Sequence, residues 1–288
     1  MHTQFGRQSY ASGAIAFIVA LGVLLSPSAA PAVDAVDAEQ PPALIAIIID
    51  DLGNQLVAGR RTIALDAPIA CAVMPHTAYS RLLAREAHGA GKEVMLHLPM
   101  QPMQAHRIAG PGEITLESGV QQLQHLLDSN FSAVPHAVGV NNHMGSLLTR
   151  HPGHMRWLMQ ALRERGDLFF IDSRTTSSSV AYAMALEGGI PAARRHVFLD
   201  PDKSPDAIEA QFDRLLRQAQ RRGYAIGIGH PYPATLDLLE AKFAQLKDDA
   251  RFEVVPVSTI VGLLESGDLQ RETGPVIVSH LSAQSHGR

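Results

Sequence analysis

Two adjacent carboxylates end the first strongly apolar stretch of the sequence. Residues 43–49 are all apolar, and Asp50 and Asp51 follow them directly. Burying a carboxylate without a partner carries a large free-energy cost, and two neighbouring carboxylates repel each other. A bound cation would offset both effects, with one carboxylate as its ligand and the other left to accept a proton. The pair therefore predicts a site for a metal ion and for proton transfer.

Other apolar stretches also end in groups that bind metals or move protons. They end in imidazole, amide or carboxylate side chains: His97; Asn141, Asn142 and His143; Asp172; Asp200; and His230. A single aspartate at a strand end often caps the following helix, so the prediction depends on the coincidence across several strands. Because sites of parallel α/β folds form at the carboxyl ends of the strands, we expect these side chains to meet at one rim.

The elements that position these groups alternate along the chain. Short apolar stretches, typical of buried parallel strands, are separated by longer amphipathic segments typical of helices. Glycines that suit helix ends follow three of the helical segments, at Gly91, Gly166 and Gly223. Roughly seven or eight such strand–helix units favour a (β/α) barrel, with a doubly wound open sheet as the alternative.

Composition favours a globular protein and argues against a nucleic-acid binder. Of the 288 residues, 46% are hydrophobic and 18% are charged, and the net charge is −4. Without a surplus or a run of Lys and Arg, the chain cannot neutralise phosphates on the scale that nucleic-acid binding needs.

The amino terminus has the features of an export signal. Arg7 precedes an apolar run at residues 14–25, and the small residues Ala30 and Ala32 follow it. The run is short for a membrane span of about 20 residues and is typical of a signal peptide. We expect a signal peptide at 1–32, a linker at 33–42, a barrel domain at 43–266 and a loosely ordered tail at 267–288. The mature chain would be periplasmic or secreted, without a stable membrane span; an uncleaved membrane anchor is the alternative.

Five segments, in order, resemble the divergent polysaccharide deacetylase family of bacterial envelopes. They are AIIIDDLG, VMLHLPMQP, GVNNHMGS, FFIDSRTT and AIGIGHPYPATL, and the resemblance extends over about residues 44–264. It implies an irregular (β/α) barrel of the NodB polysaccharide deacetylase type, with parallel strands and outer helices. It also implies a hydrolase that uses one divalent metal ion to remove acetyl groups from an acetylated envelope polysaccharide.

The resemblance implies a metal-binding role for three strand-end residues. Asp50 matches the family's catalytic base, and Asp51 matches a metal ligand. The family has two further histidine ligands separated by three residues, but here His97 is followed by Gln101 at the second position. We expect His143, at the tip of the next strand, to replace the missing ligand. Two imidazoles and one carboxylate, with positions left open, suit Zn²⁺.

The remaining motifs match family residues that take part in the reaction. Asp172 and Arg174 stand where the family has a structural and polarising acid motif. His230 takes the place of the acid that protonates the leaving group. The resemblance thus adds Asp172, Arg174 and His230 to Asp50 as candidate catalytic residues.

Asp50 and Asp51 can act in one site only if the first strand turns between them. Adjacent residues of a strand point to opposite faces. Gly53 follows closely and permits a turn. We therefore expect Asp51 to turn over the rim towards the metal, and Asp50 to stay beside the attacking water as its base.

Two other functions are compatible with parts of the sequence. Gln101 favours a catalytically degenerate barrel that binds a glycan or an envelope partner without turnover. Metal-dependent phosphoester hydrolysis is less favoured, because Arg174 is the only arginine among the rim motifs. We expect His76, His151 and His154 to lie in loops or at helix starts rather than on the metal.

Overall fold

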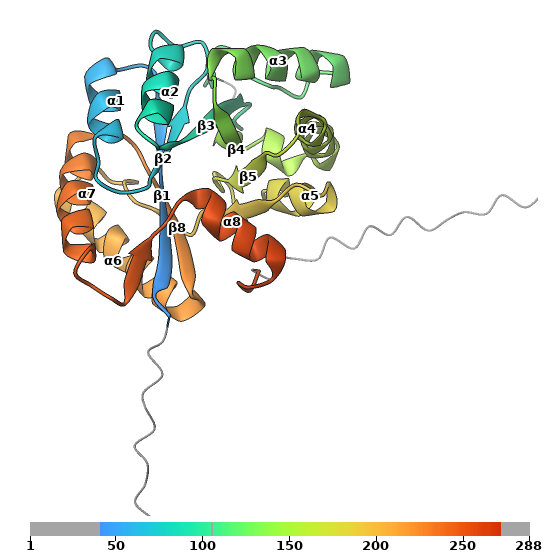
Figure 1. The fold of residues 1–288 in the computed structure, drawn as a ribbon. Helices are drawn as coiled ribbons and strands as arrows, with labels where there is room; N and C mark the ends of the chain where they lie inside the picture. The colour runs from blue at the N-terminus through green and yellow to red at the C-terminus, as the bar shows by residue number, and fades with distance from the viewer. Residues whose placement is uncertain (1–40, 105, 272–288) are drawn as a thin grey trace, which may run out of the picture. The chain divides into compact units, whose positions relative to one another are not determined.

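Parallel strands alternate with helices throughout residues 41–104 and 106–271, which the structure, a computed structural model, describes (Figure 1). The strands are β1 (Ala43–Leu52), β2 (Ala70–Val73), β3 (Glu93–Met100), β4 (Ala137–Met144), β5 (Phe169–Asp172), β6 (Ala192–Arg194), β7 (Val197–Phe198), β8 (Tyr224–Gly229) and β9 (Phe252–Val254). The helices are α1 (Leu56–Ile63), α2 (Ser80–Gly89), α3 (Val120–Ala133), α4 (Pro152–Arg165), α5 (Ala181–Glu187), α6 (Pro205–Arg222), α7 (Pro233–Leu246) and α8 (Val257–Ser266).

The strands form one parallel sheet that is wound in a single direction. From edge to edge the order is β6-β5-β4-β3-β2-β1-β8-β7, and β9 pairs with the first residues of β1. Because β1 to β6 are added one after another on the same side, their crossover helices fall on one face of the sheet. A doubly wound sheet reverses direction at a central strand and carries helices on both faces. That alternative is therefore wrong.

Residues 192–198 bring the two edges of the sheet together. Only Arg195 and His196 separate β6 from β7. The Arg195 N–H donates to the carbonyl of Asp172 on β5 (3.0 Å), and the His196 N–H donates to the carbonyl of Ile226 on β8 (2.9 Å). One irregular segment thus closes the curled sheet, while α1 to α7 surround it (Figure 1). The predicted irregular (β/α) barrel is confirmed.

The interior of the barrel is apolar, and α8 closes it at the amino ends of the strands. Glu93, the first residue of β3, accepts hydrogen bonds from the N–H groups of Val257 (2.7 Å) and Ser258 (3.2 Å). It thereby satisfies N–H groups that the first turn of α8 leaves unpaired. Side chains of α8 join the inward-facing strand residues in one buried cluster: Ala46, Ile48, Ala70, Ala72, Met95, Phe169, Ile171, Ala193, Tyr224, Ile226, Ile228, Val255, Val257, Ile260, Val261 and Leu264.

The outer helices each bury one face against the sheet, as the apolar spacing predicts. In α6 the buried residues are Ile208, Phe212, Leu215 and Ala219, which recur on one side of a helix. Gly223 ends α6 at φ 81, a left-handed conformation that glycine adopts without strain. A larger apolar cluster lies between these helices and the sheet.

Within residues 41–104 and 106–271, the first element is β1, which begins at Ala43, and the last is α8, which ends at Ser266. The predicted signal peptide, residues 33–40 of the predicted linker and residues 272–288 of the predicted tail lie outside the described residues. No helix within 41–104 and 106–271 combines the length and apolar character needed to cross a bilayer.

Candidate active site

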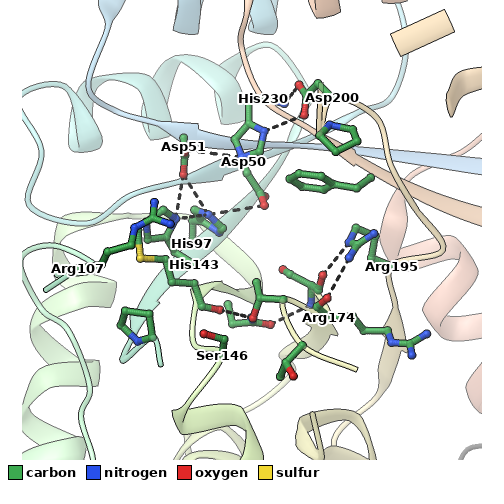
Figure 2. Close-up of a pocket in the computed structure, with 18 of the residues that line it drawn as sticks. Asp50, Asp51, His97, Arg107, His143, Ser146, Arg174, Arg195, Asp200 and His230 are labelled. Atoms are coloured by element: carbon green, nitrogen blue, oxygen red, sulfur yellow. Dashed lines mark hydrogen bonds and ion pairs between the residues drawn. The ribbon is translucent and has the colours of Figure 1, made fainter. Parts of the chain in front are cut away.

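A pocket of about 840 Å³ opens at the carboxyl-end rim of the barrel (Figure 2). Asp172 does not line this pocket. The other six of the seven candidate residues do line it: Asp50, Asp51, His97, His143, Arg174 and His230. The structure therefore brings together at one rim side chains that lie far apart in the sequence.

Asp51, His97 and His143 direct one ligand atom each towards a common point. Asp51 Oδ1 lies 3.2 Å from His97 Nε2 and 3.0 Å from His143 Nδ1, and the two ring nitrogens are 3.0 Å apart. Asp51 Oδ1 is buried, and no described residue donates a hydrogen bond of normal geometry to it. Although burial opposes ionisation, His143 and His97 hold the pKa of Asp51 well below its ordinary value. We call these three residues the triad.

The triad fits a divalent metal ion. Ligand atoms about 2.0–2.1 Å from a tetrahedral zinc ion lie about 3.3 Å from one another. The three separations in the triad, 3.0, 3.0 and 3.2 Å, are close to this spacing. Two imidazole nitrogens and one carboxylate oxygen are also the donor types that such sites use. The same three residues line the pocket, so a metal ion held by them would be accessible to a ligand bound there.

The backbone of β1 turns between Asp50 and Asp51, as expected. Asp51 has φ 59, and the register between β1 and β2 shifts between Ile49 and Leu52. Gly53 follows at φ 118, and a Cβ atom there would lie 2.2 Å from Thr77 Oγ1. The turn therefore requires glycine at position 53, and it allows both carboxylates to face the pocket.

Asn141 connects the candidate base to a triad histidine. Its Nδ2 donates to Asp50 Oδ1 (2.7 Å), and its Oδ1 lies 2.9 Å from His97 Nδ1. Because a carboxylate can only accept, the amide NH₂ must face Asp50 and the amide oxygen must face His97. The proton of neutral His97 is then on Nδ1, which leaves the Nε2 lone pair directed at the triad centre.

Asp50 and His97 are both buried and electrostatically coupled. Asp50 Oδ2 lies 3.6 Å from His97 Nε2. Burial raises the pKa of Asp50, and His97 and His230 counteract this in part. Burial opposes a charge on His97, yet Asp50 and Asp51 raise the pKa of its ring to about 9. The two carboxylates thus favour positive charge at the triad, which either a proton or a metal ion can supply.

His230 is held by Asp200, a residue that was not among the predicted site residues. Asp200 Oδ1 lies 2.9 Å from His230 Nδ1, and Oδ2 accepts hydrogen bonds from the His230 N–H (2.7 Å) and the Thr235 hydroxyl (2.8 Å). Burial disfavours the imidazolium, but the bond to Asp200 raises the pKa of His230. The other ring nitrogen, Nε2, lies 3.7 Å from Asp51 Oδ2, so His230 faces the triad.

Asp172 lies behind the pocket wall and positions Arg174. Its Oδ1 accepts a hydrogen bond from the Arg174 N–H (2.8 Å), and its Oδ2 accepts one from the Ser179 hydroxyl (2.8 Å). Arg195 Nη2 donates to the Arg174 carbonyl (3.0 Å), and Arg195 Nε donates to the Ser173 carbonyl (2.7 Å). Hydrogen bonds therefore hold the Arg174 backbone at both its N–H and its carbonyl, and Asp172 supplies one of them.

Gln101 is turned away from the triad. Its Oε1 accepts a hydrogen bond from the Leu116 N–H (2.8 Å), and the residue does not line the pocket. His76 instead contacts Asn130 Oδ1 (3.0 Å), and His154 contacts the Leu116 carbonyl (3.1 Å). Among the described residues, the metal-ligand group consists of Asp51, His97 and His143 alone.

Sequence reasoning missed three residues at this rim. Asn141 and Asp200 were recognised as strand-end residues but received no role, and Arg195 carried no signal. Two arginines outside the five motifs, Arg107 and Arg195, line the pocket together with Arg174. The strand-end position was the signal that could have identified Asn141 and Asp200.

Known proteins are similar to this chain in sequence. The family model described as divergent polysaccharide deacetylase matches residues 47–261. An uncharacterized protein of Haemophilus influenzae is 38% identical over 205 residues, which cover 71% of this chain and 72% of that protein. The uncharacterized protein YibQ of Escherichia coli is 37% identical over 205 residues, which cover 71% of this chain and 64% of that protein. The match thus spans less than two thirds of YibQ.

A solved structure shares the fold. The uncharacterized protein ATU2773 of Agrobacterium tumefaciens superimposes with a TM-score of 0.72 at 20% identity, over 76% of this chain and 89% of that chain. The family match at residues 47–261 includes the triad, Asp50, Asn141 and the Asp200–His230 pair. The chain belongs to the divergent polysaccharide deacetylase family.

Proposed function

We propose that the protein is an exported, metal-dependent hydrolase that removes acetyl groups from an envelope carbohydrate. The strongest support is the meeting of Asp51, His97 and His143 around one point, with Asp50 and His230 next to them. Hydrolysis of an acetyl ester or amide needs an activated water, a base and an acid. This rim holds side chains suited to all three tasks.

Asp51, His97 and His143 are the proposed metal ligands. A divalent ion held there would polarise the acetyl carbonyl and lower the pKa of the attacking water. We expect Zn²⁺, because two neutral imidazoles and one carboxylate are a donor set that zinc enzymes use. Asn141 fixes the ring orientation of His97 (2.9 Å), so this ligand is oriented before a metal arrives.

Asp50 is the proposed general base. Its Oδ2 lies 3.6 Å from His97 Nε2, which is farther than the ligand atoms of the triad lie from one another. Asp50 is therefore beside the triad but not part of it. Asn141 occupies its Oδ1 (2.7 Å), which leaves Oδ2 to accept a proton from the attacking water. A general base in such a position accelerates hydrolysis by about 10²–10⁴-fold.

His230 is the proposed general acid. Asp200 binds its Nδ1 (2.9 Å), so Nε2 is the nitrogen that faces the reacting group. That nitrogen lies 3.7 Å from Asp51 Oδ2, near enough to the triad to protonate a departing amine or alkoxide. The Asp200 carboxylate would stabilise the imidazolium form of His230 until the ring releases this proton.

The shape of the rim favours a polymeric substrate. A second pocket of about 280 Å³ is also lined by Asp51, His230 and Tyr232, which line the main pocket too. The two pockets thus adjoin at these residues, and a carbohydrate chain bound at the reacting centre would have room in both. This arrangement supports a polysaccharide rather than a small acetylated metabolite.

The competing proposal, a glycan-binding protein without activity, depended on Gln101. That side chain is engaged elsewhere, by the Leu116 N–H (2.8 Å), and His143 completes a group of three ligands without it. A protein that only binds a glycan needs neither Asp50 nor His230 beside a metal site. The geometry therefore favours the enzyme.

Metal analysis followed by acetate release tests this proposal. We expect the purified exported protein to hold about one metal ion per chain and to release acetate from at least one member of a panel of N- and O-acetylated oligosaccharides. Chelation should abolish release, and added Zn²⁺ should restore it. Release that survives complete metal removal, or a protein that binds no metal, would contradict the proposal.

Export has its own test. Amino-terminal sequencing of the exported protein should find Val33 first, since we propose cleavage after Ala32. A chain that still begins with Met1 would indicate a membrane anchor.

A further inference from the structure

The pocket has a second half whose chemistry the proposed hydrolysis does not use. Its cations are Arg174, Arg195 and Lys203, and hydroxyl groups of Ser146, Thr175 and Thr176 accompany them. The carboxylates that line the pocket contact histidines at the triad end: Asp50, Asp51 and Asp200. In a chain of net charge −4, this half of the pocket is a local concentration of positive charge. We call it the cationic half.

Arg174 is held in a fixed position at the pocket wall. Its φ of 48 lies in the left-handed region, where a non-glycine residue is strained and needs support from its surroundings. Asp172 supplies that support at the N–H (2.8 Å) and Arg195 at the carbonyl (3.0 Å). The point at which the Arg174 side chain leaves the backbone is therefore fixed, and the residue lines the pocket.

Arg195 adds a second guanidinium, which hydrogen-bonds to backbone carbonyls rather than to a carboxylate. It donates to two backbone carbonyls, those of Ser173 (2.7 Å) and Arg174 (3.0 Å), and it lies over the ring of Phe198 at 5.0 Å. Among the described residues, no carboxylate is within ion-pairing distance of the Arg174 or Arg195 guanidinium. Burial and the like charge of Arg174 lower the pKa of Arg195. The more distant carboxylates of Asp50 and Asp172 offset this only in part. An anion bound between them would relieve this repulsion.

Lys203 extends the positive charge towards the general acid. Its Nζ lies 3.9 Å from the centre of the Tyr232 ring, and that ring lies 5.3 Å from the His230 ring. Lys203 and Tyr232 both line the pocket. A ligand held by the cationic half is thus near the group that would protonate its leaving atom.

We propose that the substrate carries an oxyanion, a carboxylate or a phosphate, close to the acetylated sugar, and that Arg174, Arg195 and Lys203 bind it. The substrate class is therefore an acidic rather than a neutral polysaccharide. Guanidinium groups bind such oxyanions through paired N–H donors. This inference rests on the proposed function in one respect, the assignment of a glycan as ligand.

Binding of oligosaccharides without acetyl groups tests the inference separately from hydrolysis. The probes are a uronic-acid oligosaccharide, the same oligosaccharide after reduction of its carboxyl groups, and a phosphorylated oligosaccharide. We expect the zinc-loaded protein to bind an acidic probe at least about tenfold more tightly than the neutral one, the scale of hydrogen bonds to a charged group. The preference should shrink as salt is added. The tighter of the two acidic probes identifies the oxyanion.

Charge-removing variants assign the preference to the cationic half. Arg174→Gln and Lys203→Gln should each reduce the ratio of acidic to neutral affinity. Arg156→Gln, which breaks a surface ion pair with Glu187 (3.2 Å), should keep it. Lys203 is exposed, so its variant provides the test even if Arg174→Gln does not fold.

Equal affinity of the wild type for the acidic and reduced probes, or an unchanged ratio in both variants, would overturn the inference. Failure of acetate release with an intact preference would refute only the hydrolysis.

Discussion

The two ends of the barrel are built from the same strands but from different kinds of residue. At the amino end, α8 packs Ile260 and Leu264 into an apolar interior, and Glu93 caps its first N–H groups. At the carboxyl end, the strands end in buried polar groups that contact one another, among them Asp50 and His97. The amino end gains free energy from apolar burial, whereas the carboxyl end places charges where burial disfavours them.

Backbone strain is divided unevenly between the same two ends. Five described non-glycine residues have a left-handed backbone. One of them, His136, precedes β4 at the amino end, and the other four lie at or after the carboxyl ends of strands: Asp51, His76, Met144 and Arg174. Such a conformation costs about 1–3 kcal/mol per residue. The conformation of the carboxyl end therefore costs stability, and apolar burial at the amino end and in the outer core offsets that cost. We therefore expect mutations at the carboxyl end to affect activity and metal binding, and mutations at the amino end to affect stability.

Replacement of Asp50 should have the largest effect at the carboxyl end. Asn keeps the size of the side chain but cannot take a proton from the attacking water. We expect Asp50→Asn to retain bound metal and to lose about 10²–10⁴-fold in the rate of acetate release. Metal content and acetate release are measured on the same preparations. Asp66→Asn, which removes an exposed carboxylate paired with Lys247, is the control, and undiminished release in Asp50→Asn would remove Asp50 as the base.

Replacement of Ile260 should affect the amino end alone. The side chain is fully buried in the interior cluster, so Ile260→Ala leaves a cavity and should lower the free energy of unfolding by about 2–5 kcal/mol. Denaturant unfolding measures this loss. Val57→Ala, at a position 83% exposed, should change stability by less than about 0.5 kcal/mol. Zinc affinity of the folded Ile260→Ala protein should equal that of the wild type, and a weaker affinity would show that the two ends are coupled.

Replacement of Asn141 should have a smaller effect, confined to the metal. The amide orients His97 and holds Asp50 (2.9 and 2.7 Å). Asn141→Ala should lower zinc affinity by about 10–100-fold, as loss of a hydrogen bond to a metal ligand does. Asn130 on α3 offers a matched control, because its buried amide donates to the Gly112 carbonyl (2.9 Å) away from the triad. Asn130→Ala should reduce stability without changing zinc affinity; the opposite pattern would contradict the role of Asn141.

The barrel was predictable because its signals are local. Apolar strands, amphipathic helices and polar strand ends each occupy a few consecutive residues, and their alternation indicates a parallel α/β fold. The number of strand–helix units favoured the barrel over the doubly wound sheet. The candidate ligands Asp51, His97 and His143 came from strand-end positions combined with family resemblance. Their close approach in the structure agrees with that choice.

The supporting contacts were not predictable because they depend on pairing between distant segments. Asn141 reaches His97 because the register of β3 against β4 places these two residues side by side. Asp200 reaches His230 because β7 and β8 are neighbours. Arg195 lies in the irregular segment that closes the barrel, where no periodic pattern marks a residue for function. The catalytic role of Asp172 stays a prediction, now with a contact to the Arg174 backbone (2.8 Å) as its route to the pocket.

Titration of Zn²⁺ into metal-free protein tests the central claim, that three strand ends form one metal site. We expect about one high-affinity site in the wild type. In His143→Ala the affinity should fall by more than about 100-fold, since a direct ligand should matter more than a residue that orients one. His151→Ala, which removes a histidine at the start of α4, should bind as the wild type does. A His143→Ala protein that binds Zn²⁺ as tightly as the wild type would show that His143 is not a ligand and would contradict a metal site formed by three strand ends.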